Sequence, residues 1–427
     1  MFVGSQIQQL TIMKRFEKYS VVILYIATIA GLGFSFFGSV LNSRLLSKEL
    51  FGDFKYIQNF IMLLSFLVNF GFYYSGARLI ASTEDKNKIA VLKGYLIFIS
   101  IGGLLLMLLT TVVIGLGWHK LLSADLFKLT ITIFPLLIVH PLMFYFESIF
   151  QAERKMISFS FYKILPPVLY FLLLFKFKSY CSQSLFINSI FYYGSFFIVF
   201  LFFIVKDRQV FKKKSVELNE LLVENKTYGI HLFYGSILNV GASYLLPLLI
   251  GFFNINNIDV GNFSLALSFI IPFTFLPAIV GTSYFKEFIT LNKIPVAALK
   301  RVVLSSLLLL IVTMAGIDFF IKIFLGDKYH EVGFLVRIGA PAAILHGLGD
   351  FTNKFLSAKG EANYIKKVAI IMGIVQLMAS LIFIKLFSAT GAMVAKSIGS
   401  TVYFCCLYFY YHKKYAAAKK SVLMGTL

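Results

Sequence analysis

The segment Leu50–Ala81, LFGDFKYIQNFIMLLSFLVNFGFYYSGARLIA, shows the two features from which we infer the fold, a long apolar run and a repeated motif. It opens with Phe51-Gly52-Asp53-Phe54, which we interpret as a short polar turn, and then stays apolar for the length of a bilayer. It closes at Gly76-Ala77-Arg78, before a charged loop. A similar opening, Val260-Gly261-Asn262-Phe263, follows 209 residues later and again leads into a long apolar run. This repetition indicates a chain made of two similar halves.

The composition places the chain in a membrane. Of its 427 residues 59% are hydrophobic and 14% are charged, and the mean hydropathy is +0.84. A soluble domain has about 45–50% apolar and about 25% charged residues. Apolar runs long enough to cross the hydrocarbon core recur along the sequence. We therefore expect an all-α polytopic membrane protein.

The apolar runs predict twelve transmembrane helices in two lobes of six. The predicted spans are 20–42, 56–80, 94–118, 129–150, 157–177, 185–205, 228–253, 260–285, 299–325, 335–356, 365–387 and 389–411. Residues 206–227 form a basic linker that contains Lys212-Lys213-Lys214. It divides the chain into an N-terminal lobe, residues 1–205, and a C-terminal lobe, residues 228–427. Lobes of six spans share one orientation, as in parallel repeats.

The positive charges predict which side of the membrane holds the termini. With the spans above, 27 Lys and Arg lie on the side of both termini and 11 lie on the opposite side. The positive-inside rule therefore places both termini in the cytoplasm. The net charge of +21 is then explained by helix orientation and by contact with anionic membrane lipids, so we expect no nucleic-acid partner.

No sequence pattern of an enzyme is present. The chain lacks a Walker A sequence, an HExxH pair and a GxSxG elbow, and its six histidines are scattered. The three cysteines, Cys181, Cys405 and Cys406, do not form a disulfide framework. We expect no catalytic residue, no metal site and no cofactor.

The candidate functional residues are charges within the predicted spans. A mid-helix charge costs about 2.5–3.5 kcal/mol on insertion scales, so it normally faces a partner or a polar cavity. The charges well inside spans are Glu147, Lys163, Asp318, Asp350 and Lys396. Asp318 lies four residues before Lys322, which favours mutual neutralisation on one helix face.

Lys163 has two open interpretations. It precedes Pro166-Pro167, and because proline interrupts helix hydrogen bonding, a cation beside such a site can line a cavity. The alternative is a lysine whose ammonium reaches the cytoplasmic face.

Other polar residues near span ends keep similar alternatives. Arg44, Arg78 and Arg337 either anchor helices at the interface or bind phosphate oxygens bidentately in a cavity. Asn42 and Asn69 either line that cavity or form hydrogen bonds between helices.

Several short motifs resemble one transporter family. They are Phe51-Gly52-Asp53-Phe54, Asn69-Phe70-Gly71, Ala77-Arg78-Leu79-Ile80-Ala81, Phe150-Gln151-Ala152, Leu325-Gly326-Asp327-Lys328-Tyr329, Asn353 to Gly360 and Thr390-Gly391-Ala392. In order and spacing this set is similar to the polysaccharide-transporter branch of the multidrug/oligosaccharidyl-lipid/polysaccharide (MOP) exporter superfamily, and most of all to the Wzx-type flippases of O-antigen and capsule repeat units.

The resemblance implies a function and a partner. It implies two six-helix lobes in a V, alternating access, and an undecaprenyl-pyrophosphate-linked oligosaccharide as cargo in a bacterial inner membrane. A cationic cavity suits that cargo because its pyrophosphate needs counter-charge. Other polysaccharide-assembly proteins are possible partners. Two alternatives stay open: a drug or cation antiporter of the same superfamily, and an integral-membrane polysaccharide polymerase or ligase.

Overall fold

The computed structural model describes residues 2–207, 209–211 and 215–416. These residues form helices joined by short connections, with no strand among them. The predicted all-α membrane fold is thus confirmed. Six cations counted above on the cytoplasmic side lie outside the described residues: Arg208, Lys212, Lys213, Lys214, Lys419 and Lys420.

The chain forms two compact units. Unit 1 comprises residues 1–50 and 61–234, and unit 2 comprises residues 51–60 and 235–427. The helices up to the middle of the chain are α1 (Phe2–Leu45), α2 (Lys48–Leu67), α3 (Phe72–Ala81), α4 (Lys86–Gly117), α5 (Ala124–Thr132), η1 (Phe134–Ile138), α6 (Val139–Ala152), α7 (Met156–Lys176), α8 (Lys178–Cys181), α9 (Leu185–Lys206), α10 (Ser215–Glu224), η2 (Asn225–Gly229) and α11 (Ile230–Ser236). The helices after them are η3 (Ile237–Gly241), α12 (Ala242–Phe253), α13 (Ile258–Ser283), α14 (Phe285–Thr290), α15 (Val296–Phe324), η4 (Asp327–Tyr329), α16 (Glu331–Ala358), α17 (Ala362–Tyr411) and η5 (His412–Ala416).

The predicted number of twelve spans is not confirmed. Within the described residues, nine helices are long and apolar enough to cross a membrane, or up to ten if α2 and α3 form one bent span. The predicted span 56–80 is in fact these two helices, which meet at an angle of 61°. Phe70 and Gly71 both have positive φ at the break, 47° and 82°. The predicted span 228–253 begins in the π-helical segment η2 and contains a second one, η3, and its apolar helix α12 has only 12 residues.

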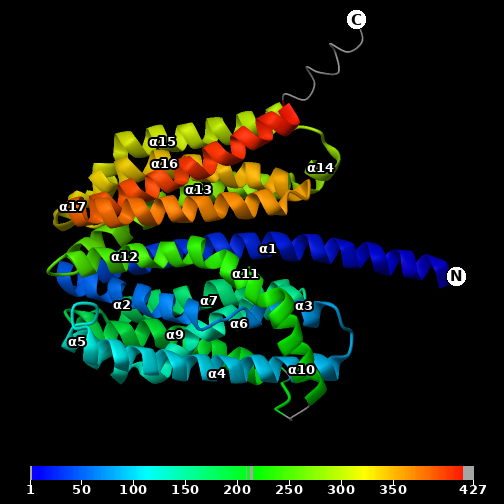
Figure 1. Cartoon of the computed structure of the whole chain (residues 1–427), viewed down its shortest axis with the longest axis horizontal. Helices are drawn as coiled ribbons and strands as arrows, with labels where there is room; N and C mark the ends of the chain where they lie inside the picture. Colours follow the sequence, from blue (N-terminus) through cyan, green and yellow to red (C-terminus); the bar gives the residue numbers. More distant parts are fainter. Residues whose placement is uncertain (1, 208, 212–214, 417–427) are drawn as a thin grey trace, which may run out of the picture. The chain divides into compact units, whose positions relative to one another are not determined.

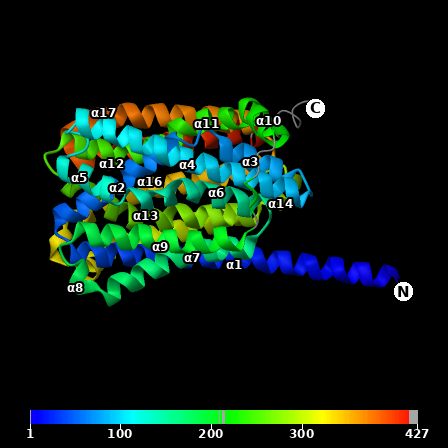
Figure 2. The ribbon, with the colours of Figure 1, turned by 90° about the horizontal axis from the view of Figure 1, so that it is seen from below.

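In unit 1 α1 packs along α7, and α7 packs on α9 (Figure 2). Pro166 and Pro167 lie inside α7, which continues past them to Lys176. Because proline has no N–H, Pro167 cannot bond the carbonyl of Lys163, four residues earlier. A Cβ on Gly31 of α1 would lie only 2.5 Å from that carbonyl oxygen. Helices α1 and α7 therefore approach closely at the Lys163 carbonyl, which lacks its helical hydrogen bond because of Pro167.

An ion network ties four helix ends of unit 1 together. Lys93 of α4, which is buried, lies 2.7 Å from both Glu153 and Asp207, and Lys155 lies 3.0 Å from the same two carboxylates. Burial alone would raise the pKa of Asp207, but the hydrogen bonds from Lys93 and Lys155 outweigh it and lower that pKa. The network connects α4 to the ends of α6 and α9 and to the start of α7.

The two repeat motifs contact each other in unit 2. Phe51-Gly52-Asp53-Phe54 is not a turn, as we expected, but part of the first turns of α2, whose N-cap Ser47 accepts a hydrogen bond from Leu50 N–H. A Cβ on Gly261 of α13 would lie 3.3 Å from the Cα of Gly52. Asn257 donates a hydrogen bond of 2.7 Å to Asp53. The duplicated motif is therefore a helix-crossing contact.

Helix α17 is a hairpin of two antiparallel arms, which meet at one end of unit 2 in Figure 1. Ser388, with φ 50° and ψ −126°, separates the arms. Across them the rings of Tyr364 and Tyr410 stack at 3.7 Å, and a Cβ on Gly399 would lie 2.8 Å from Gln376 Oε1. The arms correspond to the predicted spans 365–387 and 389–411.

We expect Gly52→Ala to destabilise the protein. Its Cβ would lie 1.9 Å from the carbonyl oxygen of Asn257, a backbone atom that cannot move alone. Overpacking of this kind costs about 1–3 kcal/mol. The melting temperature of purified protein measures the effect. Gly102→Ala is the matched control, because its Cβ would meet nothing within 4 Å. Equal melting temperatures for the two variants would contradict the packing argument.

We also expect a pH-dependent contribution from Glu361, just before α17. Hydrogen bonds from Lys414, Tyr415 and Tyr410 lower the pKa of Glu361 to about 2. Since the unfolded pKa is about 4.3, this stabilisation is present above that pH and is lost as the pH falls toward 2. Glu361→Gln should lower the melting temperature at pH 7, and the difference from wild type should shrink below about pH 4. A difference in melting temperature that does not change with pH would show that the ionised Glu361 carboxylate does not contribute to stability.

Candidate functional site

Lys163 and Glu147, two predicted site residues in unit 1, form an ion pair between α7 and α6. The Lys163 ammonium also lies 5.2 Å from the ring of Phe159 and 5.4 Å from the ring of Tyr162. Both charged side chains are about one-third exposed. The structure thus brings a cation and a carboxylate together that the sequence indicated only as separate candidates.

Arg78 is exposed on α3 and binds the helix that follows the first lobe. It donates a hydrogen bond of 2.9 Å to Glu224 of α10, and its guanidinium lies 4.5 Å from the ring of Tyr228. Lys88 and Glu220 form a second ion pair between α4 and α10. These pairs attach α10 to the rest of unit 1.

Asn42 and Asn69 are both buried in unit 1. Asn69 lies at the break between α2 and α3, where the helical hydrogen bonds are interrupted. Asn225 of η2, which we did not identify from the sequence, donates to the Phe70 carbonyl at 3.2 Å and accepts from Ser75 at 3.1 Å. Arg44, near the end of α1, is exposed.

In unit 2 Arg337 of α16 pairs with Asp318 of α15. The sequence indicated Lys322 as the partner of Asp318, so the structure gives this carboxylate a different cation. The pair is well exposed on both sides.

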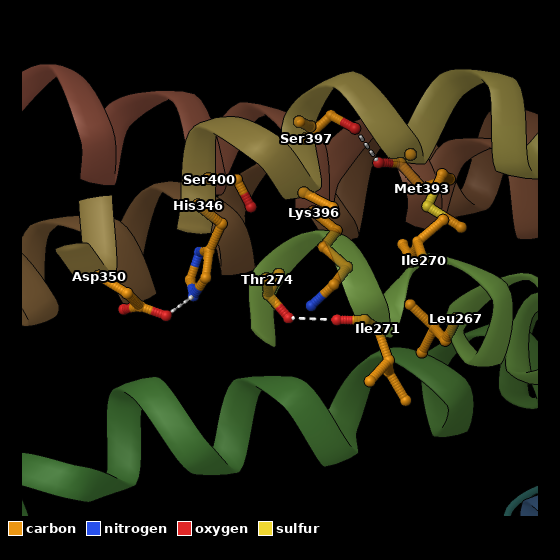
Figure 3. A pocket seen from close by; sticks show the side chains of 13 residues that line it. Leu267, Ile270, Ile271, Thr274, His346, Asp350, Met393, Lys396, Ser397 and Ser400 are labelled. Atoms are coloured by element: carbon orange, nitrogen blue, oxygen red, sulfur yellow. Dashed lines mark hydrogen bonds and ion pairs between the residues drawn. The ribbon is translucent and has the colours of Figure 1, made fainter. Parts of the chain in front are cut away.

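Two further predicted residues, Asp350 and Lys396, line one cavity in unit 2. The cavity has a volume of about 280 Å³ and lies between α13, α16 and α17. Its lining consists of Leu267, Ile270, Ile271, Thr274, Gly339, Ala342, Ala343, His346, Asp350, Met393, Lys396, Ser397 and Ser400 (Figure 3). We take this cavity as the candidate functional site.

The carboxylate of the cavity already has partners. Tyr403 donates a hydrogen bond of 3.0 Å to Asp350, and Asn353 donates one of 2.8 Å to the Tyr403 hydroxyl. His346 lies one helical turn before Asp350, with its Nε2 3.9 Å from a carboxylate oxygen and its ring stacked on Tyr403 at 4.9 Å. The i, i+4 spacing of His346 and Asp350 was a signal that we did not use.

Lys396 is the contrasting group. Its ammonium forms no ion pair and no hydrogen bond with the residues that the structure describes. Its side chain extends from α17 toward Thr274 and Ile271 of α13 (Figure 3). Thr274 donates its own hydroxyl hydrogen to the Ile271 carbonyl at 2.9 Å. The Lys396 ammonium is therefore available to bind an anionic group in the cavity.

Comparison with solved structures defines the class of fold. An inward-facing multidrug resistance MATE family transporter of the MOP superfamily is similar over 94% of this chain and 99% of its own, with TM-score 0.69 and 15% identity. The lipid II flippase MurJ in an inward closed conformation is similar over 91% and 87%, with TM-score 0.64 and 15% identity. A MOP superfamily transporter from Pyrococcus furiosus is similar over 94% and 97%, with TM-score 0.54 and 14% identity. The fold is that of the MOP superfamily transporters.

Sequence comparison gives the family. The model of the family described as "Polysaccharide biosynthesis protein" matches residues 19–285, more than half of the chain. The chain belongs to this polysaccharide biosynthesis family. A comparison with curated protein sequences finds no match. Family and fold together confirm the predicted resemblance: the chain is a multi-pass membrane protein of the polysaccharide biosynthesis family with the fold of the MOP transporters.

The Lys163–Glu147 pair predicts a measurable coupling energy. Lys163→Met leaves the Glu147 carboxylate unpaired between α6 and α7 and should lower the melting temperature. Adding Glu147→Gln removes the unpaired charge and should restore part of the loss, with a coupling of about 0.5–3 kcal/mol. Thermal unfolding of the two single variants and the double variant measures it. Strictly additive effects would show that the pair contributes no stability.

Proposed function

We propose that this protein is a flippase for lipid-linked oligosaccharide. The cargo is an undecaprenyl-pyrophosphate-linked O-antigen or capsule repeat unit, which moves from the cytoplasmic to the periplasmic leaflet of the bacterial inner membrane by alternating access. The observation that carries this proposal is the match to the polysaccharide biosynthesis family over residues 19–285. The MOP fold supports it, since that fold includes a lipid II flippase.

The charges within the protein suit an anionic cargo. A pyrophosphate that leaves water needs cations close by, because desolvating an unpaired charge costs several kcal/mol. Arg44, Arg78 and Arg337 are the candidates near span ends, Lys163 is the candidate within α7, and Lys396 is the candidate inside a cavity. Arg78, Lys163 and Arg337 would have to exchange their present carboxylate partners for the pyrophosphate. Since arginine binds phosphate oxygens through two parallel hydrogen bonds, the arginines are the better pyrophosphate ligands.

The main rival function is export of cationic drugs. A cavity for a cationic cargo needs carboxylates that are open to it. In unit 2 Asp350 accepts a hydrogen bond from Tyr403 through one of its two oxygens, and the Lys396 ammonium lines the same cavity. An ammonium repels a cationic cargo, and this favours the flippase.

The energy source and topology belong to the same proposal. The sequence has no Walker A motif, so an ion gradient or consumption of the product on the far side would drive net transport. Both termini would lie in the cytoplasm, as the distribution of Lys and Arg predicts.

Deletion of the gene tests the proposal. We expect loss of the surface polysaccharide and accumulation of lipid-linked repeat units on the cytoplasmic face, with recovery when the native gene is returned. Unchanged surface polysaccharide together with lost efflux of cationic dyes would support the drug antiporter instead. Accumulation of repeat units on the periplasmic face would favour a polymerase or ligase.

The same assay tests two cation candidates. Arg44→Ala and Lys163→Ala should reduce the surface polysaccharide while the amount of membrane-inserted protein stays unchanged, because each removes one counter-charge for the pyrophosphate. Immunoblotting of membranes gives the protein level. Wild-type polysaccharide in both variants would remove these two residues from the cargo path.

A further inference from the structure

The cavity in unit 2 is too small for the proposed cargo as a whole. Pockets for drug-sized ligands have volumes of about 300–1,000 Å³, and this cavity has about 280 Å³. An oligosaccharide with its pyrophosphate and lipid exceeds that volume several times. The cavity can therefore take one group of the size of a single sugar residue, but not the complete repeat unit.

The charges of the cavity select a singly charged anion. The Lys396 ammonium is the available cation, and Asp350 lies in the same lining with Tyr403 as its hydrogen-bond donor. A dianion such as phosphate gives up more hydration on entering the cavity than a carboxylate does, and a single ammonium supplies only one counter-charge for it. A carboxylate needs only the one ammonium. In the described residues no three His, Cys, Asp or Glu side chains gather for a metal ion, so the lining offers no competing metal site.

The hydroxyl groups of the lining add a second requirement. Thr274 donates to the Ile271 carbonyl and Ser397 donates to the Met393 carbonyl at 2.8 Å, so both hydroxyl hydrogens are already used. Their oxygens retain lone pairs and can accept hydrogen bonds from a ligand. A negatively charged ligand that also carries O–H groups can therefore donate hydrogen bonds to these two oxygens.

The remaining walls are apolar. Leu267, Ile270 and Met393 line the side opposite His346 and Asp350 (Figure 3). The C–H face of a pyranose ring is itself apolar and packs well against such side chains. Charge, hydroxyl donors, an apolar face and the volume of one ring are together the properties of an acidic sugar.

We propose that this cavity binds the carboxylate-bearing sugar of an acidic glycan, with Lys396 as the carboxylate ligand. As a statement about cargo, this rests on the proposed flippase function and narrows it to repeat units that contain a uronic-acid-type residue. As a statement about binding, it is independent of transport. The cavity would then be a subsite that recognises part of the cargo.

Binding to the purified full-length protein in nanodiscs tests the proposal. The probes are D-glucuronate, D-glucose and inorganic phosphate, each up to about 20 mM, with isothermal titration calorimetry as the readout. We expect glucuronate to bind at least about tenfold more tightly than glucose and phosphate. Equal binding of glucose, stronger binding of phosphate, or no binding of glucuronate would each overturn the proposal.

Variants locate the binding in this cavity. Lys396→Met should weaken glucuronate binding about tenfold or more, while Lys396→Arg, which keeps the charge, should retain most of it. Lys385→Met is the matched control, because Lys385 lies on the other arm of α17 and is exposed. If Lys396→Met fails to fold, Thr274→Val tests the hydroxyl contact with the same readout. Unchanged binding in the folded Lys396 or Thr274 variants would place the ligand elsewhere.

The binding assay tests the acidic-sugar site and the deletion assay tests the flippase function, so either proposal can be wrong while the other stands. If glucuronate binds through Lys396 but gene deletion leaves surface polysaccharide intact, the flippase function is wrong and the acidic-sugar site stands. If deletion abolishes the polysaccharide but glucuronate does not bind, the function stands and the acidic-sugar site is wrong.

Discussion

The whole structure depends on one constraint: inside a bilayer, every backbone N–H and C=O group needs a partner within the protein. Continuous helices meet that need, and the chain leaves helical geometry at only a few described positions within its apolar regions. At each of two such breaks, polar side chains gather. Asn225 binds the Phe70 carbonyl where α2 ends, and Asn254 and Asp259 both bind the Ser388 hydroxyl at the tip of the α17 hairpin. Amide and carboxylate side chains therefore gather where the backbone departs from helical geometry.

Close contacts between helices use the same carbonyl groups. Gly31 faces the carbonyl of Lys163, Gly52 faces that of Asn257, and Gly71 faces that of Gly229. Lipid supplies no hydrophobic drive for helix association, so helices associate through close van der Waals contact, which small residues permit. In each of these pairs a Cβ on the glycine would lie within 2.5 Å of a backbone oxygen, so none of the three positions accepts a larger residue without a shift of the backbone.

Local pattern predicted the all-α membrane fold because the length and apolar character of a span are properties of neighbouring residues. It predicted the site only in part. Lys396 and Asp350 were identified as charges inside spans, but their meeting in one cavity depends on packing between α16 and α17, which no local pattern encodes. Likewise Arg78 meets Glu224 across 146 positions of sequence. The interpretation of Phe51–Phe54 as a turn was wrong because its glycine and aspartate, common turn residues, here serve a helix crossing.

Because residues 51–60 belong to unit 2, the chain cannot be divided at the linker into two complete units. A C-terminal fragment that began after the linker would lack the ten residues that carry Gly52 and Asp53, and the α13 crossing would then expose the backbone of Asn257. Because α2 contributes residues to both units, no single cut in the chain separates unit 1 from unit 2.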